Sequence, residues 1–79
     1  MANKFDKHTK AVLAVVGLHI RQVREAQKMP QVQLAKSIGM DPTNLAKVER
    51  GARNVTIDTL VRIADGLGLD LTVKLTKRH

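Results

Sequence analysis

Apolar residues recur at helical spacing over four segments of the chain and alternate with polar residues over a fifth. In the first segment, about residues 9–28, the apolar positions follow spacings of four, four and three, which predicts one face of an amphipathic helix. These positions are Val12, Val16, Ile20 and Val23. Pro30 ends the helix, because proline disfavours a helical conformation in the residue before it. Gly17 is expected to mark a bend within it.

Two shorter helical segments follow and meet across a tight turn. The first spans Gln31–Ile38, and Gly39 follows it where a left-handed C-terminal cap is expected. Asp41 suits the N-cap of the next helix and Pro42 its first position, where a missing N–H costs nothing. The buried positions of the two helices are Leu34, Ala35, Ile38, Leu45 and Val48. Helices joined in this way match the helix-turn-helix, which places its second helix in the DNA major groove.

A fourth helix and a strand are predicted beyond the loop that follows Gly51. Thr56 can cap the helix, and Gly66 and Gly68 weaken and end it. Its apolar stripe consists of Ile57, Leu60, Ile63, Ala64 and Leu67. Strict two-residue alternation then predicts a strand over residues 69–75. Its apolar positions are Leu69, Leu71, Val73 and Leu75.

The predicted strand has no partner in the rest of the chain. One strand is not stable alone, because its backbone donors and acceptors stay unpaired. The simplest partner is the same strand of a second copy, which predicts a homodimer with antiparallel strands across a two-fold axis. The alternative is an irregular segment that continues over the core. The fold is thus expected to be mainly α, with a flexible arm (residues 1–8), a DNA-binding domain (9–68), and a dimerisation strand with a basic tail (69–79).

The charge of the chain indicates a polyanionic partner. The sequence has 14 Lys and Arg against 7 Asp and Glu, a net charge of +7 and a pI near 10.4. Duplex DNA fits best, because Phe5 is the only aromatic residue and single strands bind by stacking on such rings. A membrane is disfavoured, since the apolar run 11–18 is too short to span one and lacks aromatic anchors. Without cysteine, the reducing cytoplasm is the expected compartment.

Catalysis is not expected from this sequence. The three histidines are widely separated, Ser37 is the only serine, and the seven acids show no paired arrangement. We therefore expect no enzyme, no metal and no cofactor. The first helix is apolar on a second side between Ala11 and Leu18, which favours contact with another chain, although extra burial in the core is an alternative.

With these segments in order, the chain resembles the lambda-repressor-like helix-turn-helix family, also called the XRE family. The resemblance runs from about Val16 to Leu69. It is carried by Ile20, Val23 and Arg24 in the first helix, Gln31, Leu34 and Ala35 in the second, Gly39, and the run Val48-Glu49-Arg50-Gly51. The family implies a bundle of four or five helices, in which the second lies over the DNA backbone and the third enters the groove.

The resemblance also implies which residues read bases. They lie on the outward side of the third helix and are Pro42, Thr43, Asn44 and Lys47. Thr43 can contact thymine, Asn44 can pair with adenine, and Lys47 can reach the acceptors of guanine or a phosphate. Pro42 stands where phage repressors of the family often carry a glutamine that reads a base. That contact is therefore lost or replaced by an apolar one, which leaves the operator sequence open.

Further roles follow from the same resemblance. The expected phosphate contacts are Gln31, Gln33, Arg50, Arg53 and Asn54. Arg53 could instead enter a narrow minor groove. Arg24 and Glu49 fall where the family commonly has a salt bridge that ties the first helix to the end of the third.

The carboxyl end of the chain narrows the resemblance further. Leu67-Gly68-Leu69 followed by the strand is similar to HipB-type antitoxins, which implies a repressor of its own toxin operon that also binds a HipA-like kinase. The loop Arg53-Asn54-Val55-Thr56 is similar to restriction-modification controller proteins. A phage-type repressor is a related alternative, and a protein-interaction module with secondary DNA binding is an alternative of another class. The main expectation is a HipB-like antitoxin that binds a palindromic operator as a homodimer.

Overall fold

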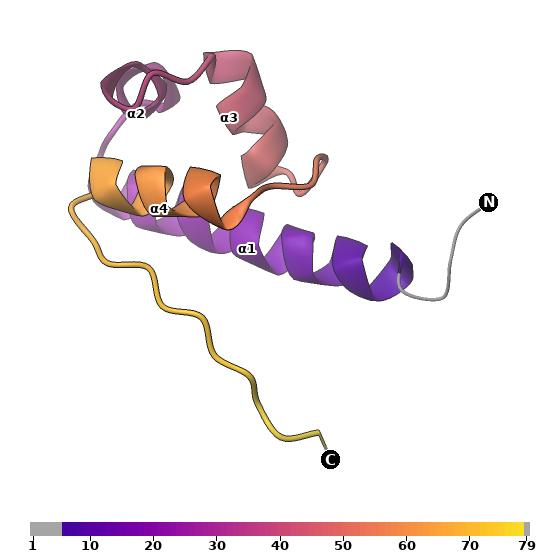
Figure 1. Ribbon diagram of the computed structural model, residues 1–79. Coiled ribbons are helices and arrows are strands. Elements are labelled where there is room, and N and C mark those ends of the chain that lie inside the picture. Colours follow the sequence, from indigo (N-terminus) through magenta and orange to yellow (C-terminus); the bar gives the residue numbers. More distant parts are fainter. Residues whose placement is uncertain (1–5, 79) are drawn as a thin grey trace.

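A computed structural model describes residues 6–78, and within them the chain forms four helices (Figure 1). They are α1 (Asp6–Ala26), α2 (Gln31–Ser37), α3 (Pro42–Glu49) and α4 (Ile57–Gly66). The long α1 runs beneath the other three, and α3 packs against it while α2 packs on both α3 and α4. The mainly helical fold is therefore confirmed, with four helices in the described part of the chain.

The core lies where α2, α3 and α4 meet. Its fully buried large side chains are Leu34, Leu45 and Ile63, one from each of these helices. Ala35, Val48 and Leu67 complete the buried cluster, and Ile20 and Val23 of α1 pack against its edge. Burying each large aliphatic side chain contributes about 1.5–3 kcal/mol. The core therefore fixes the position of α3 from its inner side.

Helix α1 differs from its prediction at both ends. It begins at Asp6, three residues before the expected start, so that part of the predicted arm is helical; the arm residues 1–5 lie outside the described chain. It ends at Ala26, because Lys28 adopts a left-handed conformation (φ 56°). The Met29 N–H then donates to the Arg24 carbonyl at 3.1 Å, which is the bond that closes a Schellman motif. The helix is thus ended by its own cap, ahead of Pro30.

Gly17 lies inside the uninterrupted α1 and serves close packing. A Cβ placed there would overlap the backbone carbonyl oxygens of Val48 and Glu49, the latter at 2.6 Å. The absent side chain therefore allows the backbone of α1 to touch the end of α3.

The strand predicted over residues 69–75 is absent from the described chain. Residues 69–78 run away from the end of α4 as an extended segment without regular secondary structure (Figure 1). The reason is physical: an extended segment becomes a strand only when a neighbour accepts its hydrogen bonds, and the described chain offers none. The apolar residues of this segment stay exposed, from 36% at Leu71 to 96% at Leu75.

No helix within residues 6–78 has the length and apolarity needed to cross a membrane.

Candidate nucleic-acid interface

The turn between α2 and α3 is built by Gly39 and Asp41. Gly39 has a φ of +68°, a conformation that other residues adopt at a cost. The backbone N–H of Met40, the next residue, donates to the Ala35 carbonyl at 2.8 Å. Asp41 then caps α3, because its Oδ1 accepts the Thr43 N–H at 2.7 Å while Pro42 occupies the first helical position. This turn and cap set the direction in which α3 leaves α2.

Replacing Asp41 with alanine is expected to lower the free energy of unfolding by about 1 kcal/mol, since the cap bond to Thr43 is lost. Thermal unfolding followed by circular dichroism measures this as a fall of roughly 4–8 °C in Tm. Asp58→Ala is the matched control, because Asp58 is an exposed acid in the first turn of α4 that does not cap it. Equal losses in the two variants would show that the charge matters and the cap does not.

The two sides of α3 differ sharply in exposure. Leu45, Val48 and Glu49 are buried, whereas Thr43 and Lys47 are exposed. Thr43 and Lys47 are four residues apart, so they lie one above the other on the outward side. The domain itself therefore leaves this part of α3 open to a large ligand.

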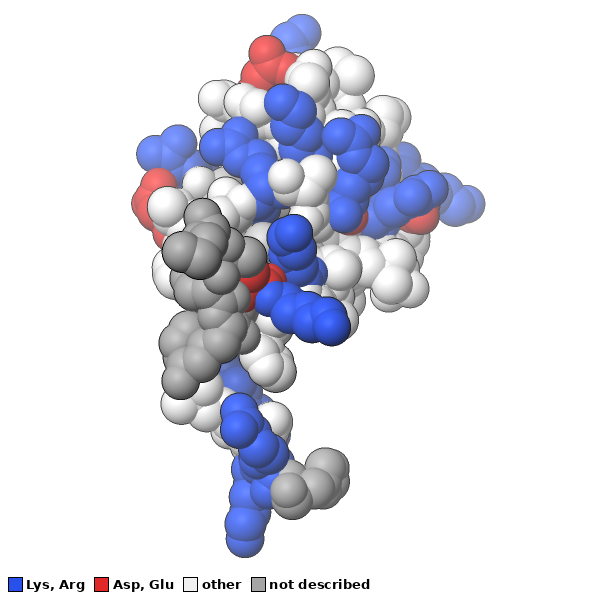
Figure 2. All heavy atoms as spheres, turned by 90° about the vertical axis from the view of Figure 1, so that its right-hand side faces the viewer, with Lys and Arg blue, Asp and Glu red and all other residues white. Residues whose placement is uncertain are grey.

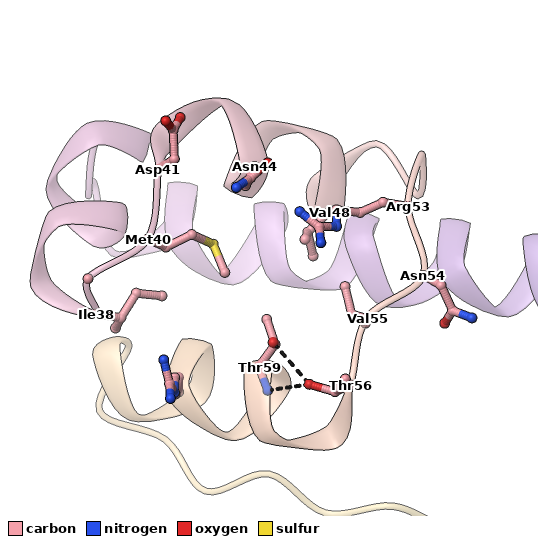
Figure 3. Close-up of a pocket in the computed structure, with 12 residues that line it drawn as sticks. Ile38, Met40, Asp41, Asn44, Val48, Arg53, Asn54, Val55, Thr56 and Thr59 are labelled. Carbon is pink, nitrogen blue, oxygen red and sulfur yellow. Dashed lines mark hydrogen bonds between the residues drawn. The ribbon is translucent and has the colours of Figure 1, made fainter.

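Asn44 lies apart from the other two polar candidates. Its side chain is half-buried and lines a hollow of about 260 Å³ between α3 and α4 (Figure 3). Arg53, Asn54 and Thr56 lie at the same hollow. The structure thus brings Thr43 and Lys47 together and groups Asn44 with the loop after α3.

The predicted phosphate-binding residues lie at the start of α2 and beyond the carboxyl end of α3. Gln33 in the first turn of α2 is exposed, as are Arg50, Arg53 and Asn54 beyond the end of α3. Figure 2 views the molecule from the side that is on the right in Figure 1, and on this face Lys and Arg side chains clearly dominate over Asp and Glu. Two of these positive charges, Arg50 and Arg53, lie beyond the carboxyl end of α3.

Arg24 and Glu49 form a buried ion pair. Arg24 Nε donates to Glu49 Oε2 at 2.7 Å and Arg24 Nη2 donates to Glu49 Oε1 at 3.0 Å. The side chains are 10% and 2% exposed. The hydrogen bond to Glu49 raises the pKa of Arg24 above its ordinary value, so the guanidinium stays charged at every accessible pH. The stability that this shift contributes is present below the ordinary arginine pKa and is lost only at pH values above it.

The same ion pair extends to α2. Gln31 Nε2 donates to Glu49 Oε1 at 2.9 Å, and Arg24 Nη1 donates to the Met29 carbonyl at 2.8 Å. The pair therefore joins α1, the first residue of α2 and the last residue of α3. The bond from Gln31 was not foreseen, because sequence alone does not show that Gln31 and Glu49 are neighbours.

Arg21 is a candidate that sequence analysis missed. It lines a hollow of about 380 Å³ together with Gln31, Ala46 and Arg50. Arg21 is exposed, and its exposed partner Glu25 is 3.5 Å away. A sequence signal existed, because Arg21 lies three residues before Arg24 and so shares its side of α1.

Within residues 6–78, His, Cys, Asp and Glu do not gather in groups of three that could hold a metal ion.

Comparison with known proteins identifies the family. The model of the Helix-turn-helix family HTH_3 matches residues 20–74. The chain belongs to this family, whose members are XRE-type, lambda-repressor-like DNA-binding domains.

Similar proteins regulate genes or restriction-modification systems. The chain is 35% identical over 57 residues to an immunity repressor protein of Bacillus phage phi105, which covers 72% of this chain and 40% of the repressor. In structure it is similar to the restriction-modification controller C.AhdI from Aeromonas hydrophila, with a TM-score of 0.74, 33% identity, and coverage of 76% of this chain and 91% of the controller. It is also similar to the controller C.Esp1396I, solved as a tetramer with its natural 35 base-pair operator, with a TM-score of 0.70, 34% identity, and coverage of 73% and 76%.

These similarities favour one of the alternatives raised by the sequence over the main expectation. They support a DNA-binding regulator of the controller or phage-repressor type. They give no support to a HipB-type antitoxin or to a HipA-like kinase partner. The short alternating segment on which that resemblance depended has no strand partner within the described chain.

Proposed function

We propose that this protein is a sequence-specific, double-stranded DNA-binding transcriptional regulator of the controller or phage-repressor type, which represses by excluding polymerase from a promoter. One observation carries the proposal: the outward side of α3 is exposed and bears Lys47, with Arg50 and Arg53 beyond its carboxyl end. The similarity to a controller solved on its operator, at 34% identity, supports it. It acts in the cytoplasm as a homodimer on a palindromic operator. Two copies of α3 occupy successive major grooves, which lie roughly 34 Å apart.

The base contacts come from the outward side of α3. Lys47 donates to the O6 and N7 acceptors of guanine, and Thr43 offers its methyl group or hydroxyl to a neighbouring base. Asn44 stands closer to the hollow beside α4 and reads the base nearest to the loop. Pro42 has no donor and adds an apolar contact at most.

The backbone contacts come from the start of α2 and from the loop that follows α3. Gln31 and Gln33 lie at the start of α2, where helix N–H groups attract a phosphate. Gln31 gives one amide hydrogen to Glu49 and keeps the second for the DNA. Arg50, Arg53 and Asn54 contact the strand from beyond the carboxyl end of α3, and Arg21 adds a charge beside Arg50. These contacts fix the register in which Lys47 meets its base.

Lys47→Ala tests base reading directly. We expect a loss of about 1–3 kcal/mol in operator binding and relaxed preference at one position of each half-site. Binding of a randomised duplex library, selected and sequenced for both proteins, measures the preference. Lys36→Ala is the matched control, because Lys36 is an exposed lysine of α2 outside the predicted contacts. A loss for Lys47→Ala that is uniform across all sequences would assign Lys47 to the backbone.

A protein-interaction module is the second candidate, and a specific observation favours it. Val12, Val15 and Leu18 of α1 are 59%, 68% and 52% exposed, a large apolar area for a small domain. Salt separates the two functions. Operator binding through several phosphates weakens steeply as salt rises. The logarithm of the binding constant falls against the logarithm of the salt concentration with a slope of about −0.9 per phosphate contact. Binding of an apolar protein partner is expected to change little.

A further inference from the structure

The start of α1 and the loop after α3 border a hollow that contains Lys10, a cation without a role in the contacts proposed above. The hollow measures about 470 Å³ and is lined by Asp6, Thr9 and Lys10 of α1 and by Gly51, Arg53 and Asn54 of the loop, among others. We propose that this hollow binds a phosphate of the DNA backbone and that Lys10 is its contact from α1. The inference rests on the DNA-binding function proposed above and deepens it, because it adds a phosphate site carried by the first turns of α1.

Close backbone packing holds the loop against α1. Gly51 has a φ of +68°, and a Cβ placed there would lie 2.8 Å from the Cα and N atoms of Ala14. Gly17, which touches the end of α3, lies three residues beyond Ala14 and therefore on the same side of α1. Lys10 lies four residues before Ala14 and shares that side. The position of Lys10 relative to α3 is thus set by two contacts of backbone with backbone.

Lys10 and Arg21 lie on either side of the point at which α3 meets α1. At a rise of 1.5 Å per residue, the two are about 16 Å apart along the helix axis. Arg21 borders a hollow together with Arg50, and Lys10 borders the other together with Arg53. A DNA strand carries a phosphate about every 3.4 Å of the duplex axis. A strand that passes the end of α3 can therefore place one phosphate in each hollow.

The charges around the hollow favour an anion. Lys10 and Arg53 are exposed, and neither belongs to an ion pair formed within residues 6–78. Among the described residues that line the hollow, Asp6 is the one acid. Two cations therefore face a single carboxylate. Thr9 and Asn54 add O–H and N–H donors, which suit the acceptor oxygens of a phosphate.

The hollow also continues the surface on which the other DNA contacts are proposed. Arg53 and Asn54 line both this hollow and the one beside Asn44. Figure 2 looks onto the side on which α1 begins in Figure 1, and Lys and Arg side chains clearly dominate there. A small anion would occupy one hollow, whereas a duplex backbone can contact a series of cations along its length. DNA is therefore the ligand that this arrangement fits.

Neutral variants of Lys10 and Asp6 test the site, because they should change affinity in opposite directions. The probe is a duplex that the natural chain selects from the randomised library, titrated at several salt concentrations. Lys10→Gln should raise the Kd about tenfold, reduce the slope of the salt dependence by about 0.9 per copy and leave the base preference unchanged. Asp6→Asn should lower the Kd about threefold, since a charge that repels the phosphate is removed. Lys36→Gln and Asp65→Asn are the matched controls, because these exposed helical residues undergo the same changes outside the hollow.

Ethylation interference on the same duplex locates the contact. Ethylation removes the negative charge of single phosphates, so ethylating the phosphate bound in the hollow should weaken binding of the natural chain and have little further effect on Lys10→Gln. Identical interference patterns for the two proteins, an unchanged Kd for Lys10→Gln, or an equal loss for Lys36→Gln would overturn the proposal. Failure of the natural chain to select any duplex would overturn the regulatory function and this site with it, so the two failures are told apart.

Discussion

Replacing Glu49 with alanine is expected to lower the free energy of unfolding by about 3–5 kcal/mol, because the Arg24 guanidinium is left buried without its counter-ion. Arg24 and Gln31 both lose the oxygens to which they donate. For a domain of this size, the expected fall in Tm is roughly 15 °C or more. Thermal and urea unfolding of the two proteins measure the difference.

The control for this variant is Arg21→Ala, which removes an exposed pair with Glu25. Such pairs contribute about 0–1 kcal/mol, so its Tm should stay close to that of the natural chain. A second comparison uses the double variant Arg24→Met with Glu49→Leu. It should be more stable than Glu49→Ala, because it leaves no unpaired buried charge. If Glu49→Ala were as stable as Arg21→Ala, the ion pair would not be a structural element.

Gly17→Ala is expected to destabilise the domain by about 1–3 kcal/mol, although alanine is the better helix former by about 1 kcal/mol. The added methyl group overlaps the carbonyl oxygens at the end of α3, and these belong to backbone that cannot rotate away. Urea unfolding measures the loss, and operator binding at a temperature where the variant is folded reports whether α3 has shifted.

Gly66→Ala is the matched control for Gly17. Its new methyl group would meet the ends of Ile38 and Leu34 side chains, both at 2.7 Å, which can change rotamer more readily than backbone can move. A smaller loss than for Gly17→Ala is therefore expected. Greater stability of Gly17→Ala than of the natural chain would mean that α1 and α3 separate easily, against the packing described here.

The bounds of three of the four helices were predictable to within a residue or two, because capping residues and glycines in the local sequence determine where these helices begin and end. Gly39 ends α2, Asp41 and Pro42 start α3, and Thr56 caps α4 by accepting the Thr59 N–H at 3.1 Å. The end of α1 was less predictable, because Lys28 adopts a conformation that glycine or asparagine usually supplies. Its start was also missed, since polar residues such as His8 can continue a helix without an apolar signal.

The candidate site was partly predictable for the same reason. Thr43 and Lys47 are outward because helical spacing places them opposite Leu45 and Val48. The contacts of Gln31 and the position of Arg21 depend on how helices pack across the domain, and local periodicity does not encode this. For residues 69–75, alternation predicts a strand that the described chain does not form, because alternation does not show whether a neighbouring strand is available.

The contact at Gly17 also determines how the domain bears load. Where α1 meets the end of α3, backbone touches backbone without an intervening layer of side chains. The ion pair between Arg24 and Glu49 links the two helices at the same place. Side chains are the compliant part of most helix interfaces, so this joint is stiff. A force applied to α1 is therefore transmitted to α3. In the proposed homodimer, contacts made through α1 would thus set the distance between the two copies of α3.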